Sequence, residues 1–320
     1  MTFPFVVDGS TIKDHKTWIR ENEFLFRDHA AVLLRNFPIK SRDSLEEYIK
    51  TIVSEKDLLD YTGGTSPRKK LGSNVYSSTE MPFFLKIPMH SEMAYRKRFP
   101  KKIFFYCETA PLIGGQTPIA DIRKVFQDVP ESIRTKLLNE GIIYYRHLKN
   151  YTVARKYLGI FNPMIKMGTW QFVFKTTDSE VVNEYCRQNH YEPEWLTDGS
   201  VILKTKLPAM NQSGAWFNSF HFFQVHSRIW GRLITPIFKL IRFLSGGLDM
   251  SATTGMRNRL SDKDISLIVD AYEKNQVEFN WQEGDLLYLD NTRTAHGRNP
   301  YFGKRKILVS LAEEGEFTSV

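Results

Sequence analysis

The chain has 320 residues, of which 42% are hydrophobic, 13% aromatic and 25% charged. These proportions are those of an ordinary globular protein with enough apolar side chains for a sizeable core. The net charge of +8 could suit a nucleic acid, a membrane surface or an acidic partner. However, Lys and Arg are spread along the chain, with small clusters only at 68–70 and 96–98. No base-stacking motif accompanies them, so we expect a solvated basic surface and no nucleic-acid partner.

Cysteine usage and the apolar segments indicate a cytoplasmic protein without a membrane span. Cys107 and Cys186 form no C-x-x-C pattern, which favours a reducing compartment. The first residues lack a charged stretch followed by an apolar run, so no secretory signal is visible. Residues 232–247 are too few to span a bilayer and include Lys239 and Arg242. They could form an amphipathic lid or surface helix, but an ordinary core-facing helix is the preferred interpretation.

The hydrophobic pattern predicts the following elements in chain order. A helix is expected over 41–61, ended by Gly63-Gly64, and a strand over 103–110 before a turn at Gly114-Gly115. A helix interrupted by Pro130 is expected over 121–140. Strands are expected over 142–145, 171–175, 285–290 and 306–312, and helices over 179–189 and 261–275. We see no repeat or linker and predict a single domain over residues 1–320. Short strands near both ends suggest a sandwich or barrel decorated by helices.

The stretch PMHSEMAY, residues 88–95, places His90 two residues before Glu92. A period of two puts both side chains on one face of an extended segment. A carboxylate among apolar neighbours needs a partner, because burying its charge is costly. The motif is a candidate for two metal ligands, although a chance H-x-E at a strand end is the simpler explanation of so short a pattern.

A second segment, residues 284–298, contains a candidate for a third metal ligand. An apolar strand leads to Asp290-Asn291 and then to His296 beside a glycine. His296 could complete a set of two imidazoles and one carboxylate with His90 and Glu92. Such a set leaves one face of the metal open and is used by non-haem Fe(II) oxygenases. Asp290 and Asn291 are expected to hold the turn or to orient the second ring nitrogen of His296. The two cysteines are more simply buried small residues.

Taken together, the chain resembles the taurine dioxygenase and clavaminate synthase-like family of Fe(II)/2-oxoglutarate oxygenases. Within it, the chain is most similar to the amino-acid hydroxylases of nonribosomal peptide and siderophore pathways, the syringomycin-type aspartate hydroxylase branch. The resemblance covers roughly residues 63–311. It rests on motifs in a fixed order: GTSPR (64–68), YSSTEMP (76–82), MHSEMAY (89–95), GGQTPIAD (114–121), WFN (216–218) and LDNTRTAHGRNPY (289–301).

The resemblance implies a fold and a set of binding residues. The fold is mainly β with α: a double-stranded β-helix, or cupin-like jelly roll, surrounded by helices. His90, Glu92 and His296 match the iron ligands, and Thr117 matches the threonine that binds the distal carboxylate of 2-oxoglutarate. An arginine clamps the same carboxylate. The chain reads Lys304-Arg305-Lys306, and neighbours point to opposite faces of a strand. We predict Arg305, with Lys306 as the alternative.

The sequence also offers candidates for binding the substrate. They are Arg68, Ser78, Trp216, Phe217, Asn218 and Arg298. Core positions are the alternative for the aromatic ones, and a surface charge is the alternative for the arginines. His147, His221 and His226 are expected not to bind the metal. Lids are predicted at about 226–257 and at 63–78, because both stretches are rich in flexible or special-conformation residues.

The resemblance also implies the chemistry. With Fe(II), 2-oxoglutarate and O2, the enzyme would hydroxylate an unactivated C–H bond of an amino acid, either free or tethered to an acidic peptidyl carrier protein. Related halogenases have a small residue in place of the carboxylate, so Glu92 argues against halogenation. A desaturase is the alternative outcome of the same chemistry. A non-catalytic binding protein on a jelly-roll scaffold is the alternative class. The sequence leaves the oligomeric state open.

Overall fold

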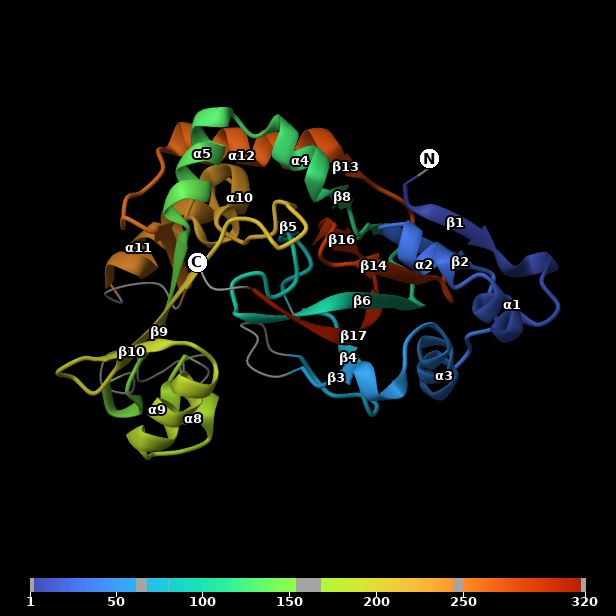
Figure 1. Ribbon diagram of the computed structural model, residues 1–320, viewed down its shortest axis with the longest axis horizontal. Coiled ribbons are helices and arrows are strands. Elements are labelled where there is room, and N and C mark those ends of the chain that lie inside the picture. The colour runs from blue at the N-terminus through green and yellow to red at the C-terminus, as the bar shows by residue number, and fades with distance from the viewer. Residues whose placement is uncertain (1–2, 62–67, 80, 154–167, 245–249, 318–320) are drawn as a thin grey trace.

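A computed structural model describes residues 3–61, 68–79, 81–153, 168–244 and 250–317 of the chain. It is a mixed structure of strands and helices, in which two sheets lie near the centre and a third lies at one side (Figure 1). Within these ranges, none of the helices has both the length and the apolar character needed to cross a bilayer.

The largest sheet of the described chain has seven strands. Its order is β1-β2-β14-β6-β17-β3, and β4 also pairs with β17. Only β1 and β2 run parallel to each other. The bounds are β1 Phe5–Asp8, β2 Ala31–Arg35, β3 Leu58–Leu59, β4 Tyr76–Ser77, β6 Arg98–Thr109, β14 Leu286–Asp290 and β17 Lys306–Glu316.

A smaller antiparallel sheet has the order β13-β8-β15-β5. Its bounds are β5 Ile87–His90, β8 Ile119–Asp121, β13 Gln276–Val277 and β15 Thr294–Arg298. A two-stranded ladder joins β7 (Ile113–Gly114) to β16 (Tyr301–Phe302).

Strand β6 shows why the large sheet is buried on both faces. One face of β6 carries Ile103, Phe105 and Cys107. These residues belong to a core cluster that also contains Met89, Ile119 and Ala295 of the smaller sheet. The other face carries Phe104 and Tyr106. They belong to a second cluster, which includes residues of helices α1 (His15–Glu21) and α3 (Arg42–Ile52). This alternation follows from the period of two along a strand. The first cluster therefore lies between the two sheets.

The third sheet, β10-β11-β9-β12, carries its own small core. Helices α8 and α9 pack on it through Trp170, Val182 and Cys186 (Figure 1, yellow-green). The bounds are β9 Ile142–Leu148, β10 Glu192–Trp195, β11 Val201–Leu207, β12 Met250–Thr254, α8 Trp170–Phe174 and α9 Ser179–Gln188.

The remaining helices cover the outside of the sheets. Helices α4, α5 and α12 contribute Val125, Leu137 and Ile268 to the cluster between the sheets. The bounds are α1 His15–Glu21, α2 Phe24–Asp28, α3 Arg42–Ile52, α4 Ile122–Asp128, α5 Glu131–Glu140, α10 Ser227–Trp230, α11 Ile234–Leu244 and α12 Asp262–Asn275, with short 3-10 helices η1 Gly9–Thr11, η2 Glu55–Asp57 and η3 His221–Phe223.

Most of the predicted elements are confirmed, and two are wrong. Residues 171–175 lie in helix α8, not in a strand. A short apolar run cannot be assigned by periodicity alone, and here Trp170 anchors the helix by packing on Trp195. The helix predicted over 41–61 ends at Ile52, because Val53 is extended and Leu58–Leu59 pair with β17. The glycines expected to end it, Gly63-Gly64, lie outside the described residues.

The predicted lid at 226–257 contains α10, α11 and β12, while residues 245–249 lie outside the described chain. Its last part is not free of the fold, because β12 pairs with β9 along its whole length. Of the other predicted lid, residues 63–67 are not described, and Tyr76–Ser77 form β4.

Candidate functional site

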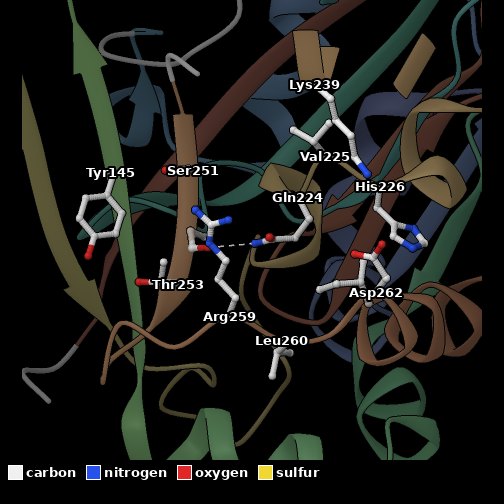
Figure 2. A pocket seen from close by; sticks show the side chains of 12 residues that line it. Tyr145, Gln224, Val225, His226, Lys239, Ser251, Thr253, Arg259, Leu260 and Asp262 are labelled. Carbon is white, nitrogen blue, oxygen red and sulfur yellow. Dashed lines mark hydrogen bonds between the residues drawn. The ribbon is translucent and has the colours of Figure 1, made fainter. Parts of the chain in front are cut away.

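A cavity of about 520 Å³ lies away from the predicted metal site. It lies beside η3 and is lined by β9, β12 and the first residues of α12 (Figure 2). None of the residues predicted to bind iron or 2-oxoglutarate lines it. Its polar lining residues are Tyr145, Gln224, His226, Lys239, Ser251, Thr253, Arg259 and Asp262.

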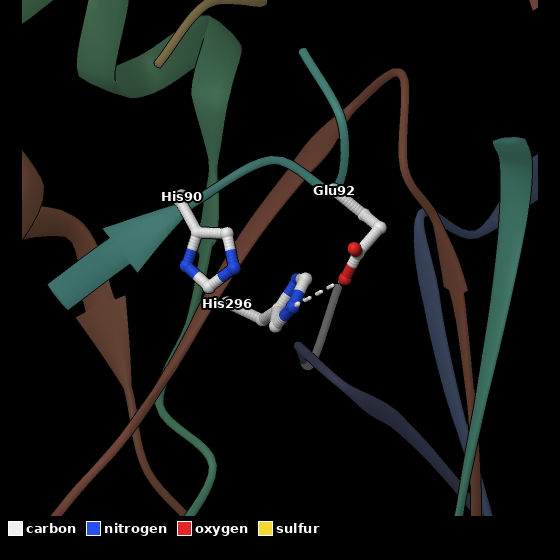
Figure 3. A group of neighbouring side chains, drawn as sticks. All are labelled: His90, Glu92 and His296. Carbon is white, nitrogen blue, oxygen red and sulfur yellow. Dashed lines mark ion pairs between the residues drawn. The ribbon is translucent and has the colours of Figure 1, made fainter. Parts of the chain in front are cut away.

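The predicted iron ligands meet where β5 and β15 lie side by side (Figure 3). His90 and His296 are paired across these two antiparallel strands, so their side chains share one face. Glu92 follows the end of β5. One ligand atom of each residue lies within 4.8 Å of the others, and His296 Nε2 is 3.8 Å from Glu92 Oε2. The structure thus gathers two imidazoles and one carboxylate around one point.

Both histidines are prepared for metal binding by their surroundings. His90 Nδ1 lies 2.9 Å from the carbonyl oxygen of Pro88. A carbonyl can only accept, so the proton is on Nδ1 and Nε2 has a free lone pair. Burial lowers the pKa of His90 and lowers the pKa of His296 well below its ordinary value. Both rings are therefore neutral at physiological pH, which is the form that binds a metal.

Glu92 is held by two partners. Arg68 Nη2 donates to Glu92 Oε2 at 2.7 Å, and the two side chains are only 4% and 7% exposed. Asn291 accepts a hydrogen bond from the backbone N–H of Glu92 and donates to the carbonyl oxygens of Glu92 and Pro100. The expectation that Asn291 orients His296 was wrong, because its side chain holds the Glu92 backbone. Asp290 holds the turn as expected, through Thr292 and Arg293.

The residues predicted to bind 2-oxoglutarate also come together. Arg305 Nη2 donates to the Thr117 hydroxyl at 3.3 Å, and Arg305 Nε donates to the Gly115 carbonyl at 2.9 Å. Burial lowers the pKa of Arg305 to about 10, so it stays charged at neutral pH. Lys306 forms an ion pair with Glu108 and is exposed. Arg305 is therefore the cation that faces inward.

Sequence reasoning missed Trp281, whose indole N–H donates to the Thr117 hydroxyl at 3.1 Å. Thr117 thus accepts from both Trp281 and Arg305, which fixes the position of its oxygen. The only available signal was a lone Trp near a strand, and such a residue usually belongs to the core.

These residues share one cavity between the two sheets. Phe105, Ile307 and Val309 line it from the large sheet, and its other walls come from β5, β15 and neighbouring loops. The predicted residues that line it are Arg68, Ser78, His90, Thr117, His296, Arg298 and Arg305. The donor set suits Fe(II), since imidazole and carboxylate are ligands that iron accepts. No thiolate competes, because Cys107 and Cys186 are buried and burial raises the pKa of both.

Three predicted substrate-binding residues lie away from the metal cavity. Trp216 packs near Phe126, and Phe217 packs against Phe99 in the core. The side-chain amide of Asn218 donates to the Ala209 carbonyl. None of the three lines the metal cavity.

Arg298 does line the metal cavity, but its amino groups donate to the carbonyl oxygens of Met81, Pro82 and Leu85. Arg298 therefore stabilises the turn formed by residues 81–85.

The three histidines predicted not to bind the metal are absent from the group of potential metal ligands found in the described chain. His221 lies near them and donates to the Met89 carbonyl at 2.7 Å. His226 caps α10 through its ring nitrogen. His147 lies on β9 in the third sheet.

Comparison with known proteins gives a consistent result. Residues 6–311 match the family described as "Taurine catabolism dioxygenase TauD, TfdA family". The chain is 31% identical over 296 residues to the dapdiamide synthesis protein DdaC of Enterobacter agglomerans, covering 90% of this chain and 84% of that protein. It is 28% identical over 320 residues to a clavaminate synthase-like protein of Arabidopsis thaliana, covering 95% and 86%.

Two solved structures share the fold, each with a TM-score of 0.51. One is a putative alpha-ketoglutarate-dependent taurine dioxygenase from Burkholderia xenovorans, with 15% identity and coverage of 97% of this chain and 87% of that one. The other is an asparagine oxygenase in complex with Fe(II), 2S,3S-3-hydroxyasparagine and succinate, with 10% identity and coverage of 93% and 79%. The family match extends over almost the whole chain, and so the chain belongs to the TauD/TfdA dioxygenases, oxidoreductases that use Fe(II), 2-oxoglutarate and O2.

Proposed function

We propose that this dioxygenase hydroxylates an unactivated C–H bond of an amino acid or an amino-acid-derived small molecule in specialised metabolism. His90, Glu92 and His296 hold the iron, and Thr117 and Arg305 hold 2-oxoglutarate. The observation that carries the proposal is that both sets of residues line or adjoin one buried cavity. Its similarity to a dapdiamide synthesis protein supports an amino-acid-derived substrate.

Each protein residue has a defined physical task in this reaction. Bound iron and 2-oxoglutarate supply the oxidation by O2, with succinate and CO2 as co-products. The buried histidines stay neutral, while Arg68 and Asn291 hold Glu92 in place. Arg305 presents a planar set of donors that suits a carboxylate. Apolar walls such as Phe105 and Val309 exclude water, and the fixed positions orient the reactants.

We also propose that residues 1–320 form one domain and that its two facing sheets are a double-stranded β-helix with the iron at its mouth. The core cluster between the sheets and the shared fold of the two solved structures support this architecture. The segment 226–257 is then a decoration of the domain that borders the larger cavity through Lys239 and β12.

An anaerobic titration of the metal-free protein with Fe(II) and 2-oxoglutarate tests the proposal. A visible metal-to-ligand charge-transfer band should form only when both are present. It should vanish in His90→Ala and persist in the matched control His147→Ala, since His147 lies on β9 outside the cavity. A folded protein that gives no band would contradict the proposed site. Mass analysis of a turned-over substrate would then separate hydroxylation, which adds one oxygen atom, from desaturation.

A further inference from the structure

We propose that Arg68 binds a carboxylate of the substrate, so that the substrate presents a free carboxylic acid group beside the iron. The inference rests on the proposed function and adds the chemical class of the ligand. A carrier-tethered amino acid has its own carboxyl group converted to a neutral thioester, so it would satisfy Arg68 only through an acidic side chain.

The hydrogen-bond state of Arg68 is the first reason. Its guanidinium lines the metal cavity and is almost fully buried. Nη2 donates to Glu92, but Nε and Nη1 are buried without any hydrogen-bond partner. The Tyr61 ring lies 4.4 Å from the guanidinium carbon and offers only a cation–π contact. Buried donors without a partner are rare and costly, so a ligand or an ordered water is expected there.

The charge balance of the cavity is the second reason. Without metal, Arg68 is neutralised by Glu92. Once iron is bound, Glu92 and one carboxylate of 2-oxoglutarate balance the two charges of the metal, and the other carboxylate balances Arg305. Arg68 would then be a buried cation whose contact with Glu92 is shared with the metal, which is unfavourable. No acidic side chain occurs among the described residues that line the cavity. A further anionic ligand beside Arg68 would restore the balance.

The other arginines of the cavity are already occupied. Arg298 donates to three carbonyl oxygens and keeps only Nε without a partner. Arg305 is held by Gly115 and Thr117 at the position proposed for the cosubstrate. Arg68 alone combines free donors with contact to a proposed iron ligand. A carboxylate suits these donors because charge-assisted hydrogen bonds to a guanidinium are strong.

Acetate and acetamide, which have the same shape but differ in charge, provide the test. The full-length protein is loaded anaerobically with Fe(II) and saturating 2-oxoglutarate, and the charge-transfer band is followed as each probe is added. In the wild type, acetate should perturb the band saturably and acetamide should not. In Arg68→Met, the acetate concentration for half-effect should rise roughly tenfold or more. Arg68→Lys, which keeps the charge, should lie between the two.

Arg96→Met is the matched control, because Arg96 is also a buried arginine but does not line this cavity. It should leave the acetate response unchanged. An equal response to acetate in the wild type and both Arg68 variants would overturn the inference, and so would a wild type that ignores acetate. If no band forms before acetate is added, the proposed function itself fails and the inference falls with it. The two failures are therefore distinguishable.

Discussion

At the start of β17, two neighbouring cations have different surroundings. Arg305 turns inward to Thr117, whereas Lys306 lies on the surface beside Glu108. Arg305 is the last residue before β17 and Lys306 is the first residue in it. Neighbouring side chains of an extended chain point to opposite sides, so only one of the two faces the cavity. The sequence could not say which one, because the answer depends on a partner, Glu108, that lies on another strand.

Replacing these two residues separates their roles. Arg305→Met should weaken 2-oxoglutarate binding by roughly ten- to a hundredfold, because charge-assisted hydrogen bonds to a carboxylate contribute about 1.5–3 kcal/mol. Lys306→Met, its matched control, should change the affinity by less than about twofold, since exposed ion pairs contribute little. The measurement is 2-oxoglutarate titration of the Fe(II) protein, anaerobically. A larger loss in Lys306→Met than in Arg305→Met would contradict the assignment.

His221, which is not one of the proposed ligands, offers a pH prediction. Its buried ring donates to the Met89 carbonyl and packs against Tyr272. Burial lowers the pKa of His221 to about 4, whereas an exposed His has a pKa of about 6.5. As the pH falls through this window, the unfolded state takes up the proton first. The folded state is therefore fully favoured above about pH 6.5 and loses stability toward pH 4.

The expected size of this effect is about 2–3 kcal/mol between pH 7 and pH 4.5. It is measured as the difference in the free energy of urea unfolding between metal-free wild type and His221→Gln, which keeps a donor. His90 and His296 are present in both proteins, so the difference reports the titration of His221. The wild type should lose more stability than the variant. A difference that does not change with pH would show that His221 is not neutral and buried.

At the scale of elements, the spacing of β5 and β15 positions the proposed iron ligands. The two strands approach closely at Gly297, where an added Cβ would lie 2.8 Å from the Ile87 carbonyl oxygen. The strand register also shifts between His296 and Arg298. A glycine is needed here for the close approach of the two backbones.

Gly297→Ala should therefore push β15 away from β5. The expected cost is about 1–3 kcal/mol of unfolding free energy, as for other overpacked positions. Iron affinity should fall as well, because His296 is the preceding residue. Urea unfolding and Fe(II) titration measure the two effects. Unchanged values in both experiments would mean that the strands do not approach as closely as described.

The elements could be predicted where local signals are strong. Helices α9 and α12 have acidic or serine caps and an amphipathic pattern, and both were foreseen within about one residue. Helix α8 and the end of α3 were missed, because their states depend on Trp195 and on pairing with β17. Dependence on distant partners also explains which residues of the site could be predicted. Motif order indicated His90, Glu92 and His296, but the contacts of Asn291, Trp281 and Arg68 join segments far apart in the chain.

At the scale of the whole molecule, the proposed site joins the two central sheets. Arg305 directly precedes β17 of the large sheet, and His90 and His296 lie on the smaller one. Ligands that bind only the folded state stabilise it by mass action, by about 2.7 kcal/mol at a concentration of one hundred times Kd.

Fe(II) and 2-oxoglutarate together should thus raise the unfolding temperature by several degrees. Anaerobic thermal unfolding measures the shift, and 2-oxoglutarate without metal should give a smaller one. In His90→Ala the shift from Fe(II) should be lost, whereas His147→Ala should retain it. A full shift in His90→Ala would place the metal elsewhere.

The pairing of His90 with His296 across β5 and β15 also bears on when the proposed site can form. The two histidines lie far apart in the chain, so the proposed pair of imidazoles exists only once these two strands have paired. A slip by one residue would turn one imidazole to the other face of the sheet. We therefore expect iron to bind after these strands have paired. Its uptake would then report that the two strands have the correct register, and the bound ion would act as a removable cross-link between distant parts of the chain.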